Sequence, residues 1–193
     1  MGLGILVLGL VVFLGTHVFV SFRGARADVI ARVGLHAYRA AFALVSLAGL
    51  ALIIWGYGQY RANGLIQVWS PPGSMRHITI GLMLFAVIFI VAAFIPSHIK
   101  TRLKHPMLAG VKTWALAHLL SNGDLGSTLL FGTFLAWGVY ARIAAKRRRD
   151  FGPATAPAGW TNDIIVVALG IVVYLALGYA FHPAVIGVPV FGK

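Results

Sequence analysis

Six apolar runs alternate with short polar segments along the 193-residue chain. They cover residues 3–22, 40–57, 78–96, 107–121, 125–141 and 163–181. An α-helix needs about 20 mainly apolar residues to cross the hydrocarbon core of a bilayer. Five runs are suited to this, whereas residues 107–121 are short. With 60% hydrophobic and only 10% charged residues, the composition excludes a water-soluble domain and predicts an integral membrane protein in a lipid bilayer.

The charged residues are strongly biased, with sixteen Lys and Arg against four Asp and Glu. All the basic residues except Arg61, Arg76 and Lys193 fall into three clusters, which follow the first, third and fifth apolar runs. Short basic loops of membrane proteins lie on the cytoplasmic side. The clusters therefore indicate topology, and we expect no nucleic-acid partner. The cluster members are Arg23, Arg26, Arg32 and Arg39; Lys100, Arg102, Lys104 and Lys112; and Arg142, Lys146, Arg147, Arg148 and Arg149.

The same rule decides how the short fourth run is interpreted. If residues 105–122 did not cross the membrane, the KRRR sequence at residues 146–149 would lie outside. If they do cross, all three basic clusters lie inside. We therefore predict an all-α bundle of six transmembrane helices, the fourth of them short, with both termini outside. Residues 1–193 are expected to form a single transmembrane domain.

Little of the usual catalytic chemistry is present in the sequence. The absence of cysteine excludes disulfides, thiolate metal sites and haem attached through a Cys-x-x-Cys-His motif. The four acids, Asp28, Asp124, Asp150 and Asp163, flank the apolar runs, which does not favour catalysis by paired carboxylates. Histidine is the remaining candidate for chemistry.

Five of the seven histidines lie at the ends of apolar runs or beside basic clusters, where a structural or interfacial role is expected. These are His36, His77, His98, His105 and His182. His182 precedes Pro183, so it is expected to end the last helix.

His17 and His118 differ because each lies inside an apolar run and should face the bundle interior. Two interpretations stay open: a buried histidine bonded to a neighbouring carbonyl, or an axial ligand of non-covalently bound haem. The structural interpretation is the commoner one. The predicted topology puts His17 near the inner end of its helix and His118 toward the outer end of its own, about 10 Å apart in depth at 1.5 Å per residue.

The segment HPMLAGVKTWALAHLLSNGD at residues 105–124 contains the second of these histidines. Pro106 suits the first turn of a helix, on which Trp114 and His118 share a face. Asn122, four residues after His118, is expected to continue this polar patch. Asn122, Gly123 and Asp124 then predict a tight turn with positive φ at Asn or Gly, and a cap on the next helix at Asp124.

This segment, extended to HPMLAGVKTWALAHLLSNGDLGSTLLFG, resembles the NnrU family of membrane proteins. THVFVSFR at residues 16–23 and AYRAAFALVSL at residues 37–47 support the resemblance, which covers roughly residues 10–145. The family is named for bacterial proteins encoded with nitrite and nitric-oxide respiration, and related zeta-carotene isomerases bind haem b. The resemblance implies the bacterial inner (cytoplasmic) membrane as the location.

By resemblance, the haem ligands of the isomerases map onto His17 and His118, with Trp114 and Asn122 in the pocket. The isomerases carry a cysteine where this chain has Ala115. The resemblance thus implies a haem-b protein that acts as a redox component or an isomerase-like catalyst on a lipophilic substrate, with a redox partner. One alternative is a non-catalytic accessory protein for nitrogen-oxide reductase systems in denitrification. A membrane methyltransferase is the less favoured alternative.

Overall fold

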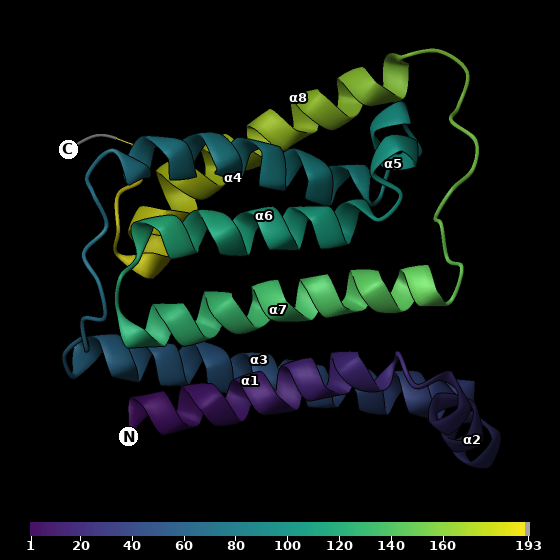
Figure 1. The fold of residues 1–193 in the computed structure, drawn as a ribbon, viewed down its shortest axis with the longest axis horizontal. Helices are drawn as coiled ribbons and strands as arrows, with labels where there is room; N and C mark the ends of the chain where they lie inside the picture. The colour runs from purple at the N-terminus through teal and green to yellow at the C-terminus, as the bar shows by residue number, and fades with distance from the viewer. Residues whose placement is uncertain (192–193) are drawn as a thin grey trace. The chain divides into compact units, whose positions relative to one another are not determined.

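The computed structural model describes residues 1–191, and these residues form helices joined by loops (Figure 1). The all-α class predicted from the sequence is confirmed. In chain order the helices are α1 (Gly2–Phe19), α2 (Arg23–Val33), α3 (Leu35–Ala62), α4 (Met75–Ala92), α5 (His98–Leu103), α6 (Pro106–Ser121), α7 (Leu125–Arg147), α8 (Thr161–Ala176) and the π-helix η1 (Leu177–Ile186).

Within residues 1–191, five helical segments are long and apolar enough to cross a membrane: Gly2–Phe19, Leu35–Ala62, Met75–Ala92, Leu125–Arg147 and Thr161–Ile186. Helix α6 has 16 residues, or about 24 Å at 1.5 Å per residue, which is shorter than the ~30 Å of hydrocarbon. Five of the predicted spans therefore have the required length. The fourth predicted span, which corresponds to α6, and the location of the termini stay predictions.

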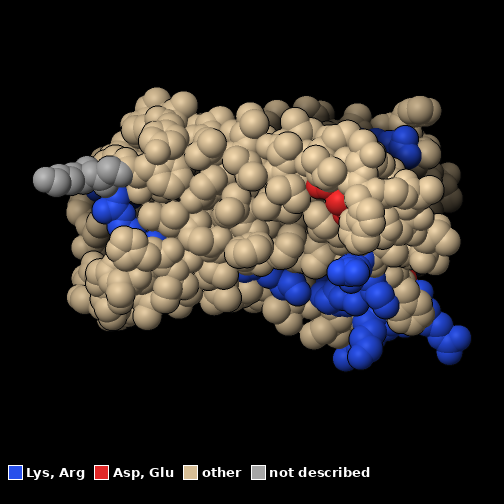
Figure 2. All heavy atoms as spheres, turned by 90° about the horizontal axis from the view of Figure 1, so that it is seen from above, with Lys and Arg blue, Asp and Glu red and all other residues tan. Residues whose placement is uncertain are grey.

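Large apolar side chains on the outside of these helices agree with a bilayer environment. Val11 on α1 and Leu47 and Ile54 on α3 are each more than 60% exposed. Figure 2 shows a surface that is mainly uncharged, on which the Lys and Arg side chains form separate groups. Such broad apolar surface is uncommon on soluble monomers, and lipid is the environment that would cover it.

The described chain forms two compact units. The first unit contains Met1–Ser70 and Asn122–Trp137, and the second contains Pro71–Ser121 and residues 138–191. Helix α7 passes from the first unit into the second.

In the first unit, α1 packs closely on α3 because glycines face the neighbouring backbone. A Cβ added to Gly9 would lie 2.6 Å from the nitrogen of Ile53, and one on Gly49 would lie 2.7 Å from the nitrogen of Phe13. These pairings run in opposite directions along the two helices, which are therefore antiparallel.

In the second unit, α4 packs against both α6 and α8. The Thr79 hydroxyl, near the start of α4, donates to the carbonyl of Ala117 near the end of α6 at 2.8 Å. Gly110, near the start of α6, lies against Ala86 and Ile90 in the second half of α4. Helix α6 is therefore antiparallel to α4 and lies beside it from Gly110 to Ala117.

Helix α8 is also antiparallel to α4. The Tyr174 hydroxyl donates to the carbonyl of Ile80 at 3.1 Å, and Gly170 lies against Ile88. The ends of α6 and α8, at Ala117 and Tyr174, thus both lie beside the first half of α4.

The expectation that His182 ends the last helix is wrong. The chain continues past it in the π-helix η1, which contains Pro183 and ends at Ile186, with Gly187 as its C-cap at a φ of 74°. Proline has no N–H and its ring clashes with the preceding turn of an α-helix, whereas the wider π-helix uses a different hydrogen-bond register. The helix therefore changes type instead of stopping.

Candidate functional site

Helix α6 begins at Pro106, as its fixed φ predicted, and presents Trp114 and His118 on the same face. The ring centroids of these two side chains lie 5.4 Å apart. Both residues are half-buried. The predicted pairing of Trp114 with His118 on one helix face is therefore present in the structure.

The imidazole of His118 is fixed by a hydrogen bond from Nδ1 to the carbonyl of Trp114, at 2.9 Å. Because a carbonyl can only accept, Nδ1 carries the hydrogen and the lone pair of the neutral ring lies on Nε2. Metal-ligating histidines are commonly oriented in this way, with one ring nitrogen bonded to a backbone carbonyl. A second imidazole, that of His182 on η1, lies with its centroid 6.3 Å from that of His118.

His17 belongs to the first unit, near the end of α1, and its ring is fixed in the same manner. Its Nδ1 donates to the carbonyl of Phe13 at 2.7 Å, and its ring stacks on that of Phe13 with centroids 4.3 Å apart. The rings of Phe42 and Trp137 lie 5.3 Å and 5.7 Å from it. His17 therefore sits in an aromatic cluster, which suits either a packed histidine or a ligand.

The two predicted ligands belong to different compact units, so their assignment to one haem stays a prediction. The place of Asn122 in the haem pocket also stays a prediction, because Asn122 follows the last residue of α6 and belongs to the first unit. Asn122 thus lies beyond the helix face that carries His118.

The Asn-Gly-Asp string forms part of the first unit through its backbone. The carbonyl of Gly123 accepts hydrogen bonds from the N–H groups of Val68 and Trp69, at 2.8 and 3.0 Å. Asp124 Oδ1 accepts from the N–H of Ser127 at 2.8 Å, which confirms its predicted role as the cap of α7.

The prediction of positive φ in this turn is wrong, because neither Asn122 nor Gly123 has it. Asp124 instead forms a bridge with Gln67, so the segment runs extended beside the loop that follows α3. Hydrogen bonds to that loop fix the segment, instead of a hydrogen bond within a tight turn.

A pocket of about 440 Å³ lies among α1, α2 and α3 in the first unit. It adjoins the His17 cluster, because its lining includes Thr16, the next residue in sequence, and Phe42, whose ring contacts His17. The Tyr38 hydroxyl is buried and has no hydrogen-bond partner among the described residues. The lining residues are mainly apolar: Gly15, Thr16, Phe19, Val29, Tyr38, Ala41, Phe42 and Val45.

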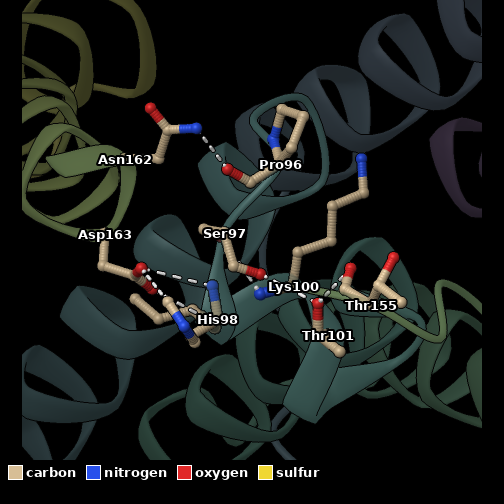
Figure 3. Close-up of polar contacts among 9 residues, drawn as sticks. Pro96, Ser97, His98, Lys100, Thr101, Thr155, Asn162 and Asp163 are labelled. Atoms are coloured by element: carbon tan, nitrogen blue, oxygen red, sulfur yellow. Dashed lines mark hydrogen bonds and ion pairs between the residues drawn. The ribbon is translucent and has the colours of Figure 1, made fainter. Parts of the chain in front are cut away.

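One polar cluster was missed by sequence reasoning (Figure 3). His98, at the start of α5, pairs with Asp163 on α8, with 2.8 Å between Nδ1 and Oδ2. The ring of His98 also stacks on that of Trp160, with centroids 4.2 Å apart. His98 precedes Trp160 and Asp163 by 62 or more positions in sequence, and no local pattern signals their contact.

Among residues 1–191, no group of three or more His, Cys, Asp or Glu side chains is placed to hold a metal ion. Structural and catalytic sites for bare zinc use three or four protein ligands. A haem differs, because its porphyrin supplies four nitrogens and the protein supplies only one or two axial ligands. A haem held by this chain would therefore need only one or two of its histidines.

The apolar helices, their exposed apolar surface and the histidines within them define an all-α integral membrane protein of the polytopic class. The chain belongs to the NnrU family: the family model described as NnrU protein matches residues 5–190. This match extends beyond the resemblance seen in the sequence and includes His182. No curated protein and no solved structure matches the chain.

Proposed function

We propose that this NnrU-family protein binds haem b between its membrane helices and acts as a redox component or an isomerase-like catalyst on a lipophilic substrate. His118 and His17 are the proposed axial ligands, with Trp114 and Asn122 in the pocket. The supporting observation is that each histidine is oriented by an Nδ1 hydrogen bond to the carbonyl four residues earlier, at 2.9 and 2.7 Å. Both rings thus carry the lone pair on Nε2, as an iron ligand requires.

Bound haem would supply one-electron chemistry or an open coordination position, and the residues around it would set both. The carbonyls of Trp114 and Phe13 fix ring orientation and make the imidazoles stronger electron donors. The indole of Trp114, 5.4 Å from the His118 ring, would exclude water on that side. With Ala115 in place of cysteine, residue 115 offers no thiolate ligand.

The pocket in the first unit supports the lipophilic class of substrate. Its walls are mainly apolar, and it adjoins the aromatic cluster that holds His17. A lipophilic molecule reaching the protein from the bilayer would bury apolar surface there, which is favourable at about 25 cal/mol per Å².

We also propose that α6 crosses the membrane, which gives six spans with both termini outside, in the bacterial inner membrane. The support is that α6 follows α4, a helix of spanning length, from Gly110 beside Ala86 to Ala117 beside Thr79. A helix that lay flat on the membrane surface would not run antiparallel to α4 over that length. Lys112 and the polar residues at both ends would let the short helix reach the two interfaces.

The deciding experiment is an absorbance spectrum of the full chain, purified in detergent from haem-replete cells, oxidised and then reduced. We expect a Soret band that His118→Ala weakens strongly. His77→Ala, at an exposed position, is the matched control and should leave the band unchanged. A colourless wild-type preparation that also fails to bind added haemin would contradict the proposal.

The resemblance to bacterial proteins encoded with nitrite and nitric-oxide respiration also supports an accessory role in that respiration. In that case a deletion strain grown anaerobically on nitrite should lose reductase activity, and a His118→Ala copy should restore it. Normal reductase activity in the deletion strain would rule the accessory role out.

A further inference from the structure

We propose that His182 supplies the imidazole opposite His118 in the haem site. This inference rests on the proposed function and changes its ligand set, because His182 takes the place given above to His17. His118 and His182 belong to the same compact unit, and their ring centroids lie 6.3 Å apart with the planes inclined by 27°.

The separation of the two rings matches that of two ligands on opposite sides of one metal. Metal–nitrogen bonds to imidazole are about 2.0–2.1 Å long, so each ring centre lies roughly 3 Å from the metal. Two opposed imidazoles therefore have centres roughly 6 Å apart, close to the 6.3 Å found here.

The local chemistry of His182 is unusual for a histidine with only a structural role. Its Nδ1 is buried and has no hydrogen-bond partner among the described residues. Buried polar atoms in folded proteins are nearly always paired, so an exception calls for a functional explanation such as a missing ligand. The half-buried residues His17, His98 and His105 show no such atom.

The backbone around His182 is also specialised. Residues 177–186 form a π-helix, a rare conformation that is found frequently at functional sites. Contacts with the rest of the second unit hold this helix and the residues after it in place. Arg76 at the start of α4 donates to the carbonyl of Val190 at 3.0 Å, and the ring of Phe191 packs on that of Tyr179 with centroids 4.6 Å apart.

Depth in the membrane favours the same pair. His118 lies near the end of α6, beside the start of α4, and His182 contacts it from the end of the last helix. The predicted topology places both at the outer side, whereas His17 falls near the inner end of its helix. His118 and His182 therefore lie at a similar depth in this topology, whereas His118 and His17 do not.

The test is the spin state of the haem in the full chain, measured by absorbance, electron paramagnetic resonance and near-infrared magnetic circular dichroism. We expect the wild type to be low-spin with two imidazole ligands. His182→Ala should retain haem but become high-spin, and added millimolar imidazole should restore the low-spin form. His77→Ala, at an exposed position outside the site, should keep the wild-type spectrum.

His182→Met tests the same position by the appearance of a new spectral band, so the result does not depend on removing a side chain. Methionine is similar in size and is itself an axial ligand, so this variant should show a thioether-to-iron band and a higher reduction potential. A low-spin bis-imidazole spectrum retained in both His182 variants, or lost in His17→Ala, would overturn the assignment of His182. A wild-type chain that binds no haem would overturn the proposed function as well, so the two failures are distinguishable.

Discussion

Asp163 on α8 caps the start of α5 through three hydrogen bonds, one of them from the His98 side chain (Figure 3). Its Oδ1 accepts from the N–H of Ile99 at 2.9 Å, and its Oδ2 accepts from the N–H of His98 at 3.2 Å and from Nδ1 of His98 at 2.8 Å. This one carboxylate therefore ties the beginning of α8 to the beginning of α5.

The first prediction is that Asp163→Ala destabilises the protein. The variant leaves the N–H groups of His98 and Ile99 without their acceptor in a partly buried place, at a cost of roughly 1–3 kcal/mol. Thermal unfolding of the purified chain in detergent should show a lower midpoint for Asp163→Ala than for the wild type. The midpoint of Asp163→Asn should lie between these two values, because the asparagine side chain keeps one acceptor oxygen.

Asp150→Ala is the matched control for this prediction. Its carboxylate is 3.9 Å from Nε2 of His105, and its side chain is 45% exposed. Exposed pairs of this kind contribute at most about 1 kcal/mol. Equal destabilisation by the Asp150 and Asp163 variants would contradict the capping role of Asp163.

The second prediction concerns the glycine contact between α1 and α3. Gly9→Ala places a Cβ 2.6 Å from the nitrogen of Ile53, so the helices must separate, at a cost of about 1–3 kcal/mol. Gly4→Ala lies on the same helix with nothing within 4 Å, and it should be neutral. The stabilities of the two variants can be compared by thermal unfolding or by protease resistance in detergent. If Gly9→Ala is as stable as the wild type, α1 and α3 pack less closely than described.

The third prediction tests the apolar pocket of the first unit. Ala41→Trp should fill it and weaken binding of a fluorescent polyene fatty acid by about tenfold, which is about 1.4 kcal/mol. Ala43→Trp adds the same bulk at an exposed position outside the lining and should not change the affinity. Equal affinity of the wild type and both variants would mean that the probe binds elsewhere.

Local chemistry explains why some features were predictable from the sequence. Pro106 starts α6 and Asp124 caps α7 because both signals act within a few residues. The Asp163 cap joins residues far apart in sequence, and the bridge of Asp124 with Gln67 replaces the tight turn that the local pattern favoured. Long-range contacts of this kind leave no periodic signal.

The candidate site shows the same division between local and long-range information. His118 could be singled out from the sequence because it interrupts an apolar run. An ionisable side chain is costly inside a membrane and commonly marks a functional site. His182 was not, because Pro183 indicated a helix end, whereas the chain continues as a π-helix that places His182 beside His118. Only the fold shows this pairing.

The last prediction decides whether α6 crosses the membrane. The chain has no cysteine, so single cysteines can be placed without background, and Ser70→Cys and Ala156→Cys are both at exposed positions. With six spans, a membrane-impermeant maleimide added to intact spheroplasts should label Ser70→Cys but not Ala156→Cys, which becomes reactive only after lysis.

If α6 does not cross, every later segment changes side, and Ala156→Cys is labelled in intact spheroplasts while Ser70→Cys is still labelled. Ser70 is thus an internal control, because the loop that follows α3 lies outside under both topologies. The positive-inside rule favours the six-span result, since it retains Lys146, Arg147 and their neighbours in the cytoplasm. Labelling of Ala156→Cys without lysis would place this basic cluster outside and reduce α6 to a helix that packs along α4 without spanning.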